Sequence, residues 1–292
     1  MPWLQLELES TPETAERLSD LLSAGGACAV TLQDAADQPL FEPPHGATPL
    51  WGATRVVGLF EADADIQAVL AALETALAPA PLPAWHLNPL EDRDWVRAWM
   101  DDFRPMRFGE RLWIIPGETA PPDPGAVNIR LDPGLAFGTG THPTTAMCLR
   151  WLDAHPPREQ TVIDYGCGSG ILAIAAARLG ARKVDAVDND PQALLATADN
   201  ALRNAVAERI STYLPDEFPP ETADLLLANI LAGPLVSLAP RFADRVRPGG
   251  GLVLSGILAG QAEAVCEAYA GAFDIAQVEQ EEDWVCLAGR RL

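Results

Sequence analysis

From residue 161 to about residue 272, segments typical of buried strands alternate with segments typical of helices, and this alternation constrains the fold more than any other feature. Strands are predicted at 161–166, 183–188, 210–214, 223–230 and 250–257, and helices at 170–180, 190–205, 232–246 and 259–272. This order favours an α/β domain with an open, doubly wound, mainly parallel sheet. Such sheets bind ligands beyond the carboxyl ends of their strands.

The first of these strands runs into a glycine-rich turn, "VIDYGCGSG", in which Asp164 precedes Gly166, Gly168 and Gly170. Glycines let the backbone turn tightly and let a ligand approach where no Cβ intervenes. Any strand-to-helix turn can use such a loop, so the loop alone is weak evidence. Its G-x-G-x-G spacing differs from the G-x-G-x-x-G of dinucleotide-binding folds and therefore favours a ligand without phosphates.

Polar side chains follow two other predicted strands. Asp188 lies 22 residues after Gly166, where a carboxylate can accept hydrogen bonds from both ribose hydroxyls of an adenosine; the alternative is a surface acid. Asp190, before Pro191, is more simply the N-cap of the next helix. Asn229 ends a hydrophobic strand, and its amide oxygen can accept a hydrogen bond from an amine; the alternative is a turn or cap asparagine.

The segment 131–145, "LDPGLAFGTGTHPTT", is rich in glycine, proline and threonine. A simple connector needs neither this backbone freedom nor so many hydroxyl groups, so we expect the segment to hold a ligand. A helix is predicted from Pro143 to about Asp153. His142 directly precedes it, and we interpret His142 as a loop anchor or helix cap rather than as a catalytic residue.

Residues 1–90 are predicted to form a separate α+β domain. Strands are predicted at 3–9, 27–34, 53–61 and 83–90, and helices at 10–26 and 64–78. The order β-α-β-β-α-β is that of a ferredoxin-like sandwich. This segment holds 12 acidic and 2 basic side chains, a net charge of −10.

A bridge at 91–110 is predicted to connect this domain to a second one at 111–292. In "EDRDWVRAWMDDF", Trp95, Trp99 and Phe103 fall on one face of a predicted helix. Aromatic residues at this spacing are more often packed than used in recognition. A short strand is predicted at 111–117.

The charge and the cysteines limit the possible partners. The net charge of −21 disfavours direct binding to nucleic acid, which depends on lysine and arginine, and would attract a basic partner. Five scattered cysteines without a C-x-x-C pair predict no metal site. The sequence shows no secretory signal, and its longest uncharged apolar stretch, 225–240, is too short to span a bilayer. We expect a soluble cytoplasmic protein, and a monomer.

A glycine loop, a ribose-binding acid and an asparagine at a strand end together describe a site for S-adenosylmethionine. Here the sequence resembles the PrmA family, the methyltransferases of large-subunit ribosomal protein eleven. The resemblance is carried by "LDPGLAFGTGTHPTT", "VIDYGCGSGILAIAA", "DNDPQA", "ANILAGPL" and "LSGILAGQAE", in that order over about residues 130–262. Many methyltransferases share the glycine motif, but "GLAFGTGTHPTT" joined to "NILAGPL" is much more specific.

The resemblance implies a Rossmann-like class I methyltransferase domain and a set of cofactor-binding residues. The family holds S-adenosylmethionine through the residues that are here Thr145, Gly166, Asp188 and Asn229. Gly168 belongs to the same glycine loop, and Thr141 can hydrogen-bond to the cofactor. We expect Phe137 either to pack against the cofactor or to act only as a hydrophobic plug of its loop.

The resemblance also implies a reaction and a substrate. Methyl groups would pass to lysine ε-amines and to the N-terminal α-amine of a basic ribosomal protein, which the acidic domain would recognise. A lysine amine, with a pKa of about 10.4, must lose its proton before it can attack, whereas an α-amine, at about 8, does so more easily. No residue is marked as the general base, and Asn229 is a candidate for orienting the amine.

Three other functions stay open. A methyltransferase of the same fold could act on another target, such as a glutamine amide, although such enzymes carry N-P-P-Y where this chain has "NILA". A nicotinamide-dependent oxidoreductase would bind NADH instead of S-adenosylhomocysteine. A non-enzymatic binding module would transfer no methyl group.

Overall fold

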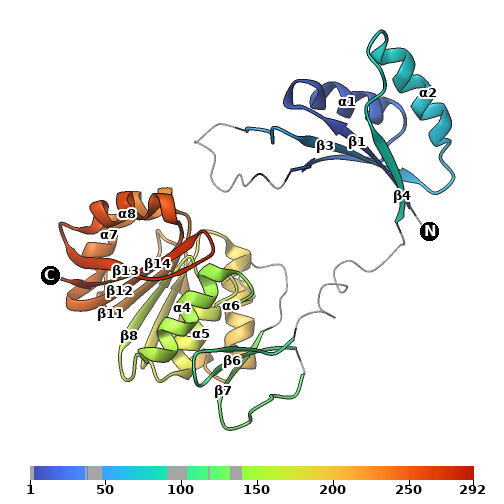
Figure 1. Cartoon of the computed structure of the whole chain (residues 1–292). Helices are drawn as coiled ribbons and strands as arrows, with labels where there is room; N and C mark the ends of the chain where they lie inside the picture. The colour runs from blue at the N-terminus through green and yellow to red at the C-terminus, as the bar shows by residue number, and fades with distance from the viewer. Residues whose placement is uncertain (1–2, 37, 39–47, 91–103, 118, 132–139) are drawn as a thin grey trace. The chain divides into compact units, whose positions relative to one another are not determined.

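The computed structural model describes residues 3–36, 38, 48–90, 104–117, 119–131 and 140–292. The chain divides into two compact units, Met1–Ala98 and Trp99–Leu292 (Figure 1). The predicted bridge helix with Trp95, Trp99 and Phe103 lies outside the described residues, as does Phe137. Within the described part of the chain, no helix is long and apolar enough to cross a membrane.

The first unit is an antiparallel sheet with two helices packed on one face. Its elements are β1 (Trp3–Ser10), α1 (Pro12–Ala24), β2 (Ala29–Asp34), β3 (Thr54–Glu61), α2 (Ile66–Leu77) and β4 (Trp85–Leu90). The sheet order is β2-β3-β1-β4, and each neighbouring pair is antiparallel. Alternate strand residues such as Leu6, Leu8 and Phe60 meet Leu18 and Leu70 of the helices in a separate core. The predicted ferredoxin-like sandwich is therefore confirmed.

The second unit contains a seven-stranded sheet with helices on both faces. Its strands are β8 (Thr161–Tyr165), β9 (Lys183–Val187), β10 (Ile210–Tyr213), β11 (Ala223–Asn229), β12 (Val246–Leu258), β13 (Phe273–Glu281) and β14 (Trp284–Arg291). The order is β10-β9-β8-β11-β12-β14-β13, parallel from β10 to β12 and antiparallel for the last two strands. The strand order reverses between β8 and β11, where open α/β sheets bind ligands.

The helices form two layers. Helices α4 (Pro143–Ala154), α5 (Ile171–Arg178) and α6 (Pro191–Arg203) contribute to the core on one face of the sheet, and α7 (Ala232–Arg245) and α8 (Ala262–Tyr269) contribute to the core on the other (Figure 1). Adjacent residues of β8 show the split, since Val162 belongs to the first core and Ile163 to the second. The continuous apolar strands predicted a sheet covered on both faces, and this is confirmed.

A small sheet precedes the large one. It consists of β5 (Met106–Phe108), β6 (Leu112–Pro116) and β7 (Val127–Leu131), in the order β5-β6-β7. The side chain of Asn204, at the end of α6, accepts a hydrogen bond from the backbone nitrogen of Arg130 (2.8 Å) and donates one to its carbonyl oxygen (2.7 Å). These bonds fix β7 just before the segment 132–139, which lies outside the described residues.

No element was predicted after residue 272, and this is where the fold departs most from the sequence-based expectation. The chain there forms the β13–β14 hairpin, and β14 lies between β12 and β13. The helix predicted at 259–272 is also shorter than expected, because 259–261 forms a 3-10 turn and α8 covers Ala262–Tyr269.

Candidate functional site at the carboxyl edge of the sheet

A cavity of about 580 Å³ lies at the carboxyl edge of the large sheet. The ends of successive strands supply its lining: Asp188 follows β9, Gly166 follows β8, and Asn229 ends β11. Gly256 of β12 and Trp284, the first residue of β14, extend the lining further along the same edge. Three predicted site residues therefore meet at one cavity.

The carboxylate of Asp188 organises two backbone segments beside the cavity. One of its oxygens accepts a hydrogen bond from the backbone nitrogen of Gly168 (2.9 Å), and the other accepts one from that of Asp190 (3.0 Å). Each carboxylate oxygen can accept a further bond from a ligand. Asp190 caps α6, because its side chain accepts a bond from the backbone nitrogen of Gln192 (2.9 Å), as predicted.

Two glycines are required where the loops after β8 and β11 approach each other. Gly166 has a φ of +82°, and a Cβ there would lie 2.2 Å from Cγ2 of Ile230. Gly256 has a φ of +83°, and a Cβ there would lie 2.3 Å from the carbonyl oxygen of Ile230. Side chains at either position would be strained and would push Ile230 out of the cavity wall.

Thr145 and Asn229 form one unit. The Asn229 side-chain nitrogen donates a hydrogen bond to the Thr145 hydroxyl (3.0 Å), although the two residues are 84 positions apart. Thr145 is only 1% exposed and is not among the residues lining the cavity, whereas its neighbour Thr144 is. The bond holds the amide nitrogen of Asn229 toward α4. The amide oxygen of Asn229 therefore points away from Thr145.

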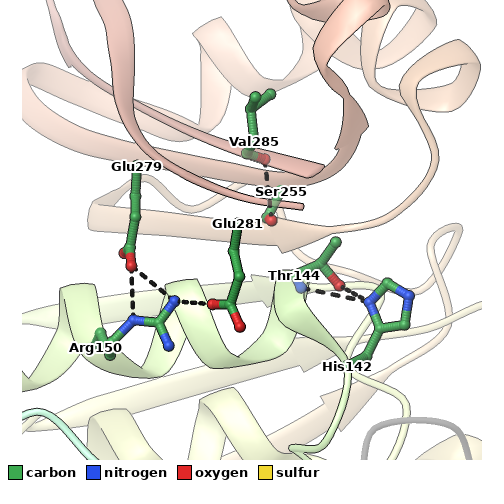
Figure 2. A network of polar contacts seen from close by, with 7 residues as sticks. All are labelled: His142, Thr144, Arg150, Ser255, Glu279, Glu281 and Val285. Carbon is green, nitrogen blue, oxygen red and sulfur yellow. Dashed lines mark hydrogen bonds and ion pairs between the residues drawn. The ribbon is translucent and has the colours of Figure 1, made fainter. Parts of the chain in front are cut away.

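His142 is the N-cap of α4, as predicted. Its Nδ1 lies 2.8 Å from the Thr144 hydroxyl and accepts a longer bond (3.4 Å) from the Thr144 backbone nitrogen (Figure 2). Burial lowers the pKa of His142, and Glu282 opposes this effect. His142 is thus neutral at pH 7, with the Nδ1 lone pair already engaged, which argues against a role as general base.

Asp164 is a buried carboxyl group that the sequence analysis did not place in the site. It is 1% exposed, and Oδ2 accepts a hydrogen bond from the backbone nitrogen of Ala173 in α5 (2.9 Å). Oδ1 has no hydrogen-bond partner among the described residues. Burial raises the pKa of Asp164 to about 7, and the charge of Asp188 adds to this rise. The only sequence feature that could have pointed to Asp164 as a site residue is its position two residues before Gly166.

Replacing Asp164 with Asn is expected to change how stability depends on pH. The folded state keeps the Asp164 proton up to about pH 7, whereas the unfolded chain loses it near pH 4, so the free energy of unfolding falls between these values as pH rises. Asn imitates the protonated carboxyl. The variant should gain stability over the natural protein across this window, by about 4 kcal/mol at most.

Urea unfolding at pH 5 and pH 8 measures this difference. Asp190→Asn is the control, because it replaces an exposed aspartate with a residue that also caps helices, and its stability should depend on pH as that of the natural protein does. Equal pH dependence in Asp164→Asn and the natural protein would contradict the prediction.

The cavity suits S-adenosylmethionine in three respects. Gly166 lines the cavity with backbone and no side chain, and Asp188 presents a carboxylate already fixed by two backbone bonds. Of the described residues that line the cavity, none is lysine or arginine, which phosphate-bearing ligands favour. These features match a nucleoside ligand without phosphates.

A larger hollow, of about 980 Å³, lies at the other end of the sheet and contains none of the predicted site residues. Charged side chains around it pair with each other. Arg150 bonds Glu279 (2.7 Å), and Arg247 bonds Asp224. Its charges therefore serve mainly to join neighbouring elements.

Comparisons with known proteins match the whole chain. The family model described as "Ribosomal protein L11 methyltransferase (PrmA)" covers residues 2–292. The ribosomal protein L11 methyltransferase of Pseudomonas paraeruginosa is 56% identical over 292 residues, covering 100% of this chain and 99% of the relative. That of Sodalis glossinidius is 55% identical, with both chains covered in full.

Solved structures agree with the family match. The crystal structure of a ribosomal protein L11 methylase from Lactobacillus delbrueckii subsp. bulgaricus matches with a TM-score of 0.58 and 32% identity. The match covers 65% of this chain and 99% of that one.

Proposed function

The chain belongs to the PrmA family of ribosomal protein L11 methyltransferases, and on this premise we propose that it methylates ribosomal protein L11 with S-adenosylmethionine as methyl donor. The acceptors are lysine ε-amines and the N-terminal α-amine. The observation that carries the proposal is the family match over residues 2–292, to which the cavity lined by Gly166, Asp188 and Asn229 gives a physical basis.

The described residues suggest how the cofactor is held. Asp188 accepts hydrogen bonds from the two ribose hydroxyls, while its bonds to Gly168 and Asp190 keep it in place. Gly166 lines the cavity with backbone alone, and its lack of a side chain lets Ile230 form the adjoining wall. Thr145 contributes through its bond to Asn229. Direct contacts from Thr141 and Phe137 stay predictions.

When bound, S-adenosylmethionine supplies a methyl group activated by a sulfonium. The amide oxygen of Asn229 accepts a hydrogen bond from the acceptor amine and so directs its lone pair. Ile230, Leu231 and Pro234 give the cavity an apolar wall, which disfavours the protonated amine. With the amine so directed, attack on the methyl carbon would release S-adenosylhomocysteine, and the methylated nitrogen would lose one proton to solvent.

The first unit is proposed to bind the substrate. Its separate core and the net charge of −10 over residues 1–90 fit a module that attracts a basic protein. The bridge at 91–110 connects it to the methyltransferase domain at 111–292. A ribosomal substrate supports a cytoplasmic location for the enzyme, and the overall negative charge argues against direct binding to nucleic acid.

Methylation of purified L11 tests the proposal. With S-adenosylmethionine, the natural protein should add mass increments of one methyl group to L11, located by fragment mass spectrometry. Asn229→Ala should slow transfer about 100-fold, because a misdirected amine loses alignment, yet still bind S-adenosylhomocysteine. Normal binding and normal transfer in this variant would contradict the role of Asn229.

The other outcomes distinguish the alternatives. Binding of S-adenosylhomocysteine without methylation of L11 would point to another substrate of the same fold or to an inactive binding module. Calorimetry that detects NADH and not S-adenosylhomocysteine would point to an oxidoreductase. Each result contradicts a different part of the proposal.

A further inference from the structure

The cavity extends well beyond the part that a nucleoside needs. Across the carboxyl edge, the strand order places Asp188, Gly166, Asn229, Gly256 and Trp284 one after another. Neighbouring strands lie about 4.8 Å apart, so Asn229 is about 10 Å along the edge from Asp188, and Trp284 is about 10 Å further. Asp188, proposed to hold the ribose, and Gly166 lie on the first side of Asn229. The second side has no assigned ligand.

Two aromatic rings from different elements form a wall on this second side. Trp284 begins β14, and His142 caps α4. Their ring centres are 4.9 Å apart with an interplanar angle of 70°, an edge-to-face contact. Both line the cavity, and Trp284 is only 9% exposed. The contact fixes both rings at one position.

The hairpin that carries Trp284 is anchored at several points. Its turn places Glu282 at a φ of +53°, and the carbonyl oxygen of Asp283 accepts a hydrogen bond from the backbone nitrogen of Ala259 (2.8 Å). Arg150 of α4 reaches across to both Glu279 and Glu281 (Figure 2). These bonds join the hairpin to α4 and to the end of β12. Trp284 is therefore held relative to Asn229 by rigid elements.

The chemistry of this side suits an aliphatic chain that ends in an amine. Gly256 lines this side of the cavity with backbone alone, and Leu231 and Pro234 add apolar surface. Glu282, exposed at the tip of the hairpin, lies close enough to influence the charge of His142. A carboxylate there attracts an incoming ammonium group, and the apolar interior favours its neutral form.

Resting on the proposed function, we propose that Trp284 and His142 form the wall of an acceptor channel that guides the stem of the substrate amine to Asn229. Trp284 determines acceptor specificity, and His142 contributes its ring to the same wall. Arg150 is a positioning residue, because it acts only through the hairpin. The channel suits the unbranched aliphatic stem of the lysine side chain, one of the two proposed kinds of acceptor.

The test separates acceptor binding from cofactor binding in the full-length protein. Trp284→Ala, Trp284→Phe and the natural protein are compared by calorimetry with S-adenosylhomocysteine, by binding of L11 to the S-adenosylhomocysteine-loaded enzyme, and by the kcat and KM of methyl transfer. Trp151→Ala is the matched control. Trp151 lies on α4, stacks on His155 and lines the other hollow.

Trp284→Ala should leave the affinity for S-adenosylhomocysteine within about twofold and lower kcat/KM for L11 at least about tenfold, the equivalent of one lost aromatic contact. Trp284→Phe should recover most of this loss, and Trp151→Ala should change neither quantity. A parallel fall in cofactor affinity would assign Trp284 to the cofactor site and overturn the proposal. Unchanged transfer in Trp284→Ala would also overturn it.

A second variant decides the matter if Trp284→Ala does not fold. His142→Asn removes the ring but keeps a side chain that caps helices well, so α4 should stay intact. It should lower kcat/KM for L11 at least about tenfold at normal cofactor affinity, and normal transfer would contradict the proposed wall. Failure of the natural protein to methylate L11 would refute the proposed function instead, so the two failures are distinguishable.

Discussion

Asp188→Ala is expected to lower the affinity for S-adenosylhomocysteine by about 100-fold to 10,000-fold. The carboxylate is proposed to accept two ribose hydroxyl bonds, and hydrogen bonds to a charged group contribute about 1.5–3 kcal/mol each. The substitution also releases the backbone nitrogens of Gly168 and Asp190, which Asp188 holds at 2.9 Å and 3.0 Å. Both the lost ribose bonds and the released loop therefore contribute to the loss of affinity. Calorimetry at fixed salt measures their sum.

Asp190→Ala is the matched control. It removes a carboxylate two residues away that caps α6 through the backbone nitrogen of Gln192. The cost should be about 1 kcal/mol of stability, with cofactor affinity within about twofold of normal. If Asp188→Ala bound normally, Asp188 would be an ordinary surface acid. Asp188→Asn, which keeps an acceptor oxygen without the charge, should fall between the natural protein and Asp188→Ala.

The meeting of Asp188, Gly166 and Asn229 could be predicted from sequence because of one property of parallel sheets. The carboxyl ends of all parallel strands lie on the same edge, so polar residues that follow neighbouring strands lie close together. The apolar strands and the capped helices also have strong local signals, as the observed N-caps His142 and Asp190 show. The family resemblance, read from motifs over 130–262, is confirmed by the match over 2–292.

The C-terminal hairpin could not be predicted in this way. β13, "FDIAQVEQE", is largely polar and lies at the edge of the sheet, so hydrophobic periodicity is weak there. β14 inserts between β12 and β13, an order set by long-range pairing rather than by local signals. As a result, Trp284 was missed as a cavity residue, and no motif in the sequence marked it.

The contact between Asn229 and Thr145 could not be predicted from the sequence either. Both residues were predicted to contact the cofactor, but the hydrogen bond between them depends on how α4 packs over β11. The raised pKa of Asp164 depends on burial under the glycine loop, which no spacing reveals. Local patterns thus identified residues that end strands and begin helices, and packing determined how those residues interact.

Removal of residues 1–90 is expected to abolish methylation of L11 and to leave binding of S-adenosylhomocysteine within about threefold of normal. The first unit has its own core, built from residues such as Leu22 and Leu73, and the cavity-lining residues that the structure describes all lie between 142 and 284. The shortened protein should therefore keep its fold and its cofactor site. Mass spectrometry of L11 and calorimetry on the same sample measure the two quantities.

Salt provides the control within the full chain. If the −10 charge of residues 1–90 attracts basic L11, raising ionic strength should increase the KM for L11, because the screening length falls from about 10 Å at 0.1 M to about 3 Å at 1 M. Cofactor affinity should change much less. A shortened protein that lost cofactor binding would show that the first unit has a structural role. Full methylation of L11 by the shortened protein would place substrate recognition in the second unit, where the β13–β14 hairpin with its acidic tip would be the first surface to test.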